Sequence, residues 1–361
     1  MLLELSQDDS GSTAEARRQI EICNACRYCE GYCSVFPAMT RQKMFSDGDI
    51  THLANLCHNC RGCYYACQYT EPHEFALNLP AALAEVRQGS WERLVWPAPF
   101  SRLFHTHGVA IAGMLVAGIS ALFALIAALP EGAGDGFYAH LSHNAMVAVF
   151  TPAFLLPLIA VAIGLYQYWR DVGAGPITLR DIRNALASAA TLRNLDGGQG
   201  QGCNFEREDR YTDLRRWFHQ AVLYGFLACF AATAVATLMH YFLDWQAPYG
   251  LFTPPKLLGV PGGIALVIGT SGLVWLKMRA DPKLGASRVW GGEMAFVLLL
   301  GLVAASGLAL YAATGTFAVP SLLALHLGSV LALFLLLPYT KMVHGFFRIA
   351  ALLAEETKRK G

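Results

Sequence analysis

The stretch CNACRYCEGYC (residues 23–33) is followed, 23 residues later, by CHNCRGCYYAC (residues 57–67). Both have the spacing C-x2-C-x2-C-x3-C and together hold eight of the ten cysteines: Cys23, Cys26, Cys29, Cys33, Cys57, Cys60, Cys63 and Cys67. The N-terminus lacks the basic start and apolar core of a secretory signal peptide, so we expect a reducing compartment. Clustered cysteines are more often metal ligands than disulfides in such a compartment. The two runs therefore predict a metal-binding head.

The spacing within each run is typical of iron–sulfur proteins. In two-cluster ferredoxins the first three cysteines of a run bind one [4Fe–4S] cluster, and the fourth binds the other cluster. We therefore expect one cluster on Cys23, Cys26, Cys29 and Cys67. We expect a second cluster on Cys57, Cys60, Cys63 and Cys33. Zinc is the alternative, but zinc sites usually consist of two well-separated C-x2-C pairs.

The residues around the two runs favour a helical head. Bacterial ferredoxins have proline directly after the fourth cysteine, whereas Ser34 and Gln68 follow the runs in this chain. Between the runs, Ser46 and Asp49 are candidate helix caps, and little of the segment alternates like a strand. We expect an all-α, ferredoxin-like domain over residues 1–100, as in the iron–sulfur subunits of succinate dehydrogenase and heterodisulfide reductase.

The rest of the chain has the composition of a membrane protein. Hydrophobic residues make up 55% of the sequence and charged residues 15%, against roughly 25% charged residues in soluble proteins. About 20 apolar residues suffice to cross the hydrocarbon core of a bilayer. Six stretches have about this length or more: 108–129, 145–169, 221–242, 257–276, 294–313 and 322–347. We expect residues 101–361 to form a six-helix, cytochrome b-like transmembrane bundle.

The positions of lysine and arginine predict the orientation. If the N-terminus is cytoplasmic, segments 130–144, 243–256 and 314–321 lie outside the membrane. They contain Lys256, which is one of the 27 lysines and arginines of the chain. Positive residues concentrate on the cytoplasmic side of multi-pass proteins. We therefore expect both termini and the cysteine head to be cytoplasmic.

The longest inside loop, residues 170–220, is polar and carries eight arginines. We expect this loop to face the head. Cys203, in a glycine-rich tract of the loop, is either an ordinary loop thiol or a residue that packs against the head. Cys229 lies inside the third span, where a free cysteine most simply acts as a small apolar residue.

Four histidines lie in or beside the third and sixth spans. An ionisable residue inside a span indicates a functional site, and neutral imidazole is a common haem ligand. His326 and His344 are 18 residues apart, which is five whole turns of one helix. His219 and His344 would share the cytoplasmic side, and His240 and His326 the outer side. This predicts two bis-histidine sites for one or two b-type haems.

Four further histidines lie outside the apolar cores of the spans and compete as ligands: His105, His107, His140 and His143. They could instead be interfacial residues or lie near a quinone pocket. No nucleotide-binding glycine fingerprint is present, because the tract 197–202 lies in a polar loop and does not follow a strand. We therefore expect the chain to bind no flavin and to contain no catalytic residue of its own.

The two cysteine runs, the six spans and two short motifs together resemble one family. The motifs are Gly202-Cys203-Asn204-Phe205 and Arg215-Arg216-Trp217-Phe218-His219. They resemble the tricarballylate utilization protein B family, also called citrate utilization protein B, over nearly the whole chain. The resemblance implies a bacterial inner-membrane protein with [4Fe–4S] clusters and haem. The paired membrane histidines are also similar to those of the cytochrome b subunits of nitrate reductase.

The resemblance further implies that the chain takes electrons from a separate FAD-dependent tricarballylate dehydrogenase and passes them to quinone. One alternative is a heterodisulfide-reductase-like or quinol-oxidising subunit with the opposite direction of electron flow. Another is a membrane protein whose iron–sulfur clusters sense redox state. The net charge of +1 gives no reason to expect a nucleic-acid partner.

Overall fold

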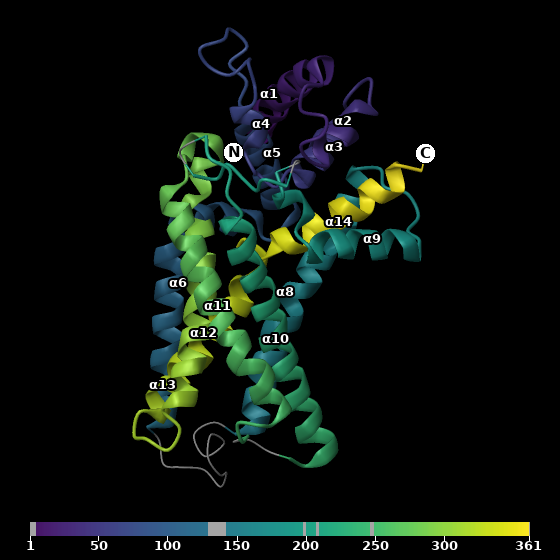
Figure 1. Cartoon of the computed structure of the whole chain (residues 1–361). Coiled ribbons are helices and arrows are strands. Elements are labelled where there is room, and N and C mark those ends of the chain that lie inside the picture. Colours follow the sequence, from purple (N-terminus) through teal and green to yellow (C-terminus); the bar gives the residue numbers. More distant parts are fainter. Residues whose placement is uncertain (1–4, 129–141, 198–199, 207–208, 246–248, 361) are drawn as a thin grey trace.

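The computed structural model describes residues 5–128, 142–197, 200–206, 209–245 and 249–360. Within these residues the regular structure is helical, apart from two isolated β-bridges, and Figure 1 shows a compact head above a bundle of long helices. The expected all-α fold is therefore confirmed.

The head consists of short helices whose ends present the cysteines. They are α1 (Leu5–Cys26), α2 (Val35–Thr40), α3 (Asp47–Leu56), α4 (Gly62–Tyr65) and α5 (Leu79–Leu94). The two candidate caps act together at the start of α3: the Ser46 hydroxyl accepts from the Asp49 N–H (3.2 Å), and the Asp49 carboxylate accepts from the Ser46 N–H (3.1 Å). This capping box satisfies two free donors of the first turn. Helix α3 ends directly before Cys57, where the second run begins.

Six helices are long and apolar enough to cross a membrane, as expected. They are α6 (Ala98–Ala127), α8 (His143–Asp171), α10 (Leu214–Leu243), α11 (Pro254–Arg279), α12 (Trp290–Ala312) and α13 (Val319–Leu336). They run side by side below the head in Figure 1. Several extend beyond the apolar stretch at their head-side ends, so polar residues of the same helices reach the head.

The sixth span differs from the expected continuous helix over 322–347. Helix α13 ends at Leu336, a 3-10 turn follows (η4, Leu337–Tyr339), and a separate helix begins at Val343 (α14, Val343–Lys358). Pro338 lacks an N–H donor and its ring disfavours a continuing α-helix, which explains the break. The five-turn relation between His326 and His344 therefore does not apply, because the two residues lie on different helices.

The hydrophobic core of the head continues into three later elements. Ile20, Ile50 and Leu83 of the head share one buried cluster with Tyr168 of α8 and Phe347 of α14. The Tyr168 and Phe347 rings pack edge to face, with centroids 5.6 Å apart. Full burial of such side chains stabilises a fold by about 1.5–3 kcal/mol each. Helix α14, yellow in Figure 1, therefore joins the head to the bundle, with α9 (Leu179–Ala190) beside it.

Helices α10 and α11 approach each other backbone to backbone. A Cβ atom at Gly225 would lie 2.8 Å from the Gly262 carbonyl oxygen, and one at Gly269 would lie 2.7 Å from the Phe218 carbonyl oxygen. Small residues at helix contacts allow this close packing within membranes. The packing fixes the segment of α10 that directly precedes His219.

Candidate functional site

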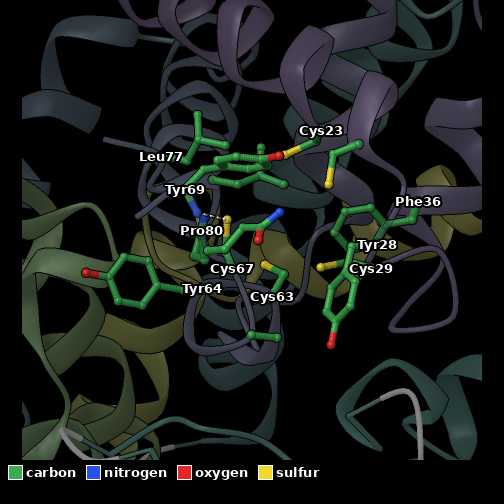
Figure 2. Close-up of a pocket in the computed structure, with 14 residues that line it drawn as sticks. Cys23, Tyr28, Cys29, Phe36, Cys63, Tyr64, Cys67, Tyr69, Leu77 and Pro80 are labelled. Carbon is green, nitrogen blue, oxygen red and sulfur yellow. Dashed lines mark hydrogen bonds between the residues drawn. The ribbon is translucent and has the colours of Figure 1, made fainter. Parts of the chain in front are cut away.

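The first group of cysteines surrounds a cavity of about 250 Å³ in the head. Its wall includes Cys23, Cys26 and Cys29 of the first run, together with Cys67 and Cys63 of the second. Figure 2 shows the sulfur atoms of Cys23, Cys29 and Cys67 around the same space. Burial, followed by the charges of Cys67, Cys29 and Cys26, raises the pKa of Cys23 to about 12. The structure thus brings together the four cysteines expected for one cluster.

The second group lies deeper in the head. Cys33, Cys57, Cys60 and Cys63 line a neighbouring cavity of about 20 Å³. Burial, followed by the charges of Cys60 and Cys57, raises the pKa of Cys33 well above its usual value. Cys60 is 8% exposed, whereas Cys26 of the first group lies on the surface. The fourth cysteine of each run therefore lies with the first three of the other run.

The number and grouping of these cysteines fit the ligand sets of two four-iron clusters. Among the described residues, no group of three or more His, Cys, Asp or Glu side chains could hold a single metal ion. A [4Fe–4S] cluster has an iron at each of four corners with a separate cysteine on each, so its ligands surround a larger space. Burial, followed by the charges of neighbouring cysteines, raises the pKa of Cys23 and Cys29, and bound iron would oppose this effect by favouring thiolates.

On the head side of the bundle, the structure brings together His219 of α10 and His344 of α14. Their ring centroids are 5.7 Å apart, with the ring planes 80° to each other. The His344 Nδ1–H donates to the Lys341 carbonyl oxygen, which leaves the lone pair on Nε2. Burial, followed by the charges of His219 and Arg348, lowers the pKa of His344 well below its usual value, which favours the neutral form of the ring.

The His219 ring has an unsatisfied nitrogen, because its buried Nδ1 has no hydrogen-bond partner among the described residues. A neutral imidazole with a free Nε2 lone pair therefore lies beside a second imidazole that lacks a partner. Metal-bound histidines are oriented in the same way as His344, by a hydrogen bond from the other ring nitrogen to a carbonyl. The donor set fits a bis-histidine haem.

The head-side end of α10 connects this histidine pair to the second cysteine run. Arg215 lies four residues before His219, which places it one turn away on a similar face of the helix. Its guanidinium donates to the carbonyl oxygens of Asn59 (2.6 Å) and His58 (3.0 Å), both within the second run. One helix thus carries a candidate haem ligand and a direct contact to the loop that holds Cys57 and Cys60.

The Gly202–Phe205 motif lies against the same loop. The Asn204 N–H donates to the Cys60 carbonyl oxygen (2.9 Å), and Cys203 is buried in a small cluster with Cys60. Phe205 stacks under the guanidinium of Arg61 (4.6 Å from its ring centroid) and also under that of Arg215. The Cys203 thiol donates to a neighbouring carbonyl oxygen, so Cys203 packs against the head and is more than an ordinary loop thiol.

The histidines at the other end of the bundle are arranged differently from the expected pairing. The ring of His240 stacks on that of His143, at 4.3 Å between centroids and 23° between planes. The His143 Nε2 also lies 2.8 Å from the Tyr241 hydroxyl. His326 instead points toward α12, where its Nδ1 is 3.1 Å from the Ser306 hydroxyl. The side of α13 that carries His326 thus packs on α12.

The other competing histidines lie elsewhere. His105 is buried on α6 against Gly292 of α12, and its Nδ1 has no partner among the described residues. His107 is exposed at a kink of α6. His140 lies outside the described residues. In the head, His52 is buried, and its Nε2 lies 3.3 Å from a carboxylate oxygen of Glu355.

One ionic group was not anticipated from the sequence. Glu293, at the head-side end of α12, forms ion pairs with Lys277 of α11 and with Lys341 (2.6 Å). Lys341 also supplies the carbonyl oxygen that accepts from His344. The sequence feature that could have predicted these ion pairs is the position of Glu293 directly before an apolar stretch, because a carboxylate at that position requires a partner.

Comparisons with known proteins agree with these features. A family model described as "Citrate utilization protein B" matches residues 102–361, and one described as "Citrate utilization protein B Fer4-like domain" matches residues 16–92. Over 347 residues, the chain is 45% identical to "Citrate utilization protein B" of Escherichia coli, covering 94% of this chain and 91% of that protein. No solved structure matches the chain significantly. The chain is a member of the citrate utilization protein B family.

Proposed function

We propose that this chain is the membrane electron-transfer subunit of an oxidoreductase system. It accepts electrons from a reduced FAD-dependent dehydrogenase, of the tricarballylate dehydrogenase kind, and delivers them to the quinone pool. Two [4Fe–4S] clusters and one or two b-type haems supply one-electron transfer when bound. The head and both termini face the cytoplasm, and the six spans lie in a bacterial inner membrane.

The observation that carries this proposal is the crossed grouping of the eight cysteines. Each cavity is lined by three cysteines of one run and the last cysteine of the other, and Cys63 lies between the two cavities and lines both. This is the ligand arrangement of two-cluster ferredoxins. It supports Cys23, Cys26, Cys29 and Cys67 as one ligand set. It supports Cys33, Cys57, Cys60 and Cys63 as the other.

The different depths of the two cysteine groups support an order of electron transfer, from the first group to the second. Cys26 is exposed, so the first group is the one that a soluble partner can approach. The loop of the second group contacts Arg215, one turn from His219. The residues of the first group therefore receive electrons from the partner, and those of the second face the bundle.

Two histidine pairs are proposed to hold haem. His219 and His344 form the head-side pair, in which the Lys341 carbonyl keeps the His344 proton on Nδ1. At the far end, the stacked rings favour His143 as the partner of His240. His326 keeps its position through Ser306, and under this proposal its role is to pack α13 on α12.

Metal analysis of the protein purified from membranes tests the cofactors. We expect about eight non-haem irons per chain, four for each cubane, and a cluster EPR signal after reduction. Cys60→Ser should remove one cluster, whereas Cys229→Ser, outside both cysteine groups, should retain both. Zinc in place of iron, or iron retained in full by Cys60→Ser, would contradict the proposed ligand sets.

The direction of electron flow is tested with membranes that contain the chain. Addition of the substrate-reduced flavoprotein partner should bleach the cluster absorbance and then produce the reduced haem bands. A quinol analogue without the flavoprotein should reduce the haem far less. If the quinol reduces the clusters and the flavoprotein does not, the chain is a quinol-oxidising subunit instead.

A further inference from the structure

We infer that three arginines, Arg87, Arg215 and Arg348, compensate the charge of the second cysteine group and hold its reduction potential above that of the first. This inference rests on the proposed function, because it requires that both groups bind [4Fe–4S] clusters. It assigns to these arginines a positioning and potential-setting role that the cysteine pattern alone does not predict.

From three different helices, the three arginines converge on the end of α3 and the loop that follows it. Arg87 of α5 donates to the Cys57 carbonyl oxygen (2.9 Å) and Arg348 of α14 to the Asn55 carbonyl oxygen (3.5 Å). Arg215 of α10 donates to the two carbonyls after Cys57, as described above. The segment that carries Cys57 and Cys60 is therefore held by three guanidinium groups.

The positions of two of these arginines also relate the loop to the candidate haem ligands. Arg215 precedes His219 by four residues, and Arg348 follows His344 by four residues. Residues four apart on a helix are neighbours on the same face. Each helix therefore presents a histidine to the bundle and an arginine to the cysteine loop.

The three arginines lack an ion-pair partner in the described part of the chain. Among the described residues, no Asp or Glu forms an ion pair with Arg87, Arg215 or Arg348, whereas Arg41 and Arg93 of the same head do have such partners. Arg87 is 7% exposed. Buried charges are usually paired or compensated, because desolvation of an isolated charge is costly. The unpaired positive charge calls for a nearby anion.

The cysteines of the second group supply that anion when they bind a cluster as thiolates. Burial, Arg87 and Arg215 lower the pKa of Arg348, while the charge of Cys57 and, to a smaller extent, that of Glu293 raise it. Arg215 lowers the pKa of Cys60, against the larger opposite effect of burial. These charges therefore interact across the loop, in addition to the hydrogen bonds that hold it.

Within the residues that the structure describes, no arginine side chain donates to a backbone carbonyl of Cys23, Cys26, Cys29 or Cys67. The charges that act on Cys23 and Cys29 are those of other cysteines. The arginine within the first run, Arg27, is exposed and donates to the Asn24 carbonyl oxygen in the last turn of α1. Water screens an exposed charge far more than a buried one. Two runs with the same spacing thus have different electrostatic surroundings.

The different numbers of nearby arginines should give the two clusters different reduction potentials. One-electron reduction adds one negative charge to a cluster that already carries four thiolates. Net charge, hydrogen bonding and exposure set the potential of such a cluster, and buried positive charge favours the reduced form. The arginines therefore draw an electron supplied by the reduced flavin partner from the first group to the second, toward the bundle.

Potentiometric titration of the purified protein, followed by EPR, tests the inference. The signal that disappears in Cys60→Ser identifies the second cluster. We expect Arg348→Gln and Arg87→Gln to shift that signal to lower potential and to leave the other signal unchanged. Arg27→Gln, the matched control on the first run, should shift neither signal. Arg348→Lys retains the charge and should titrate like the unmodified protein.

Two results would overturn the inference. One is an unchanged potential in both glutamine variants while cluster content is full. The other is an Arg348→Lys protein that behaves like Arg348→Gln, which would mean that guanidinium geometry matters and charge does not. If Arg87→Gln does not accumulate, Arg348→Gln decides, because its hydrogen bond to the loop is the longest of the three. An unmodified protein without iron or cluster signals would instead refute the proposed function.

Discussion

The two ends of the helix bundle contain histidine pairs that are built in different ways. At the head side, His219 and His344 come from helices that both contact the head, and the His344 ring is oriented by the Lys341 carbonyl. At the far end, His143 and His240 stack at the terminal turns of α8 and α10. The first site lies beside the core of the head, which includes Val343 and Phe347 on either side of His344, whereas the second lies between helices of the bundle.

The cause of this difference is the break at Pro338. A continuous sixth helix would carry His344 along the line of α13, but the break allows α14 to turn beneath the head. The core residues of α14 then pack with the head, as Phe347 does against Trp91 and Tyr168. Changes in the head should therefore reach the head-side histidines and leave the far pair unaffected.

The largest effect is expected from His344→Ala. Loss of this imidazole removes one of two ligands at the head-side pair, so the variant should lose one haem per chain and all flavoprotein-driven reduction of the far haem. Pyridine-haemochrome content and reduced-minus-oxidised spectra measure this. His107→Ala, an exposed position on α6, serves as the control and should match the unmodified protein. Retention of every haem band in His344→Ala would mean that His344 is not a haem ligand.

A second set of variants addresses the far end. We expect His143→Ala and His240→Ala each to remove the same haem band, while His326→Ala retains it, because the His326 ring is directed to Ser306 of α12. The spectra of the three variants, recorded at equal protein content, distinguish the pairs. If His326→Ala and His240→Ala lose the band and His143→Ala does not, the pairing expected from the sequence is correct.

An intermediate effect is expected at Glu293, which supports the head-side site from α12. Glu293→Gln leaves Lys277 and Lys341 without their carboxylate. The side chain of Lys341 is 32% exposed, so we expect a loss of roughly 2–3 kcal/mol, less than at a fully buried pair. The segment that orients His344 should also shift, which would change the head-side haem potential and leave the far one unchanged.

Thermal unfolding in detergent and a haem redox titration measure these two effects. Glu293→Asp retains the negative charge and is the matched control for stability and potential. An equal change at both haems in Glu293→Gln would mean that the two ends of the bundle are not independent.

The parts predicted well from the sequence are those set by local spacing. The crossed cysteine grouping follows from the x2, x2, x3 pattern, because a fourth cysteine placed after a turn lies away from the first three. The proximity of His219 and His344 followed from the antiparallel course of two apolar stretches. The five-turn relation between His326 and His344, which does depend on rotation about a helix axis, failed because the two residues lie on different helices.

The parts that were missed depend on rotation and on long-range packing. The side of α13 that carries His326 is decided by contact with Ser306 of α12, and this contact leaves no signal in the sequence near His326. The convergence of Arg87, Arg215 and Arg348 requires three helices from distant parts of the chain. The sequence shows that Glu293 is a charge beside a span, but it does not show that Lys277 and Lys341 are its partners.

The smallest effect is expected from Ser306→Ala, which tests whether His326 has a structural role. Ser306 is 3% exposed, and its hydroxyl lies 3.1 Å from His326 Nδ1. Removal of one partner of a buried hydrogen bond costs about 1–3 kcal/mol, because the remaining nitrogen loses its partner. If His326 only packs α13 on α12, thermal stability in detergent should fall by this amount while both haem bands and both haem potentials stay unchanged. If a haem potential shifts in Ser306→Ala, His326 belongs to a haem site, and the far end is then built around three histidines and not two.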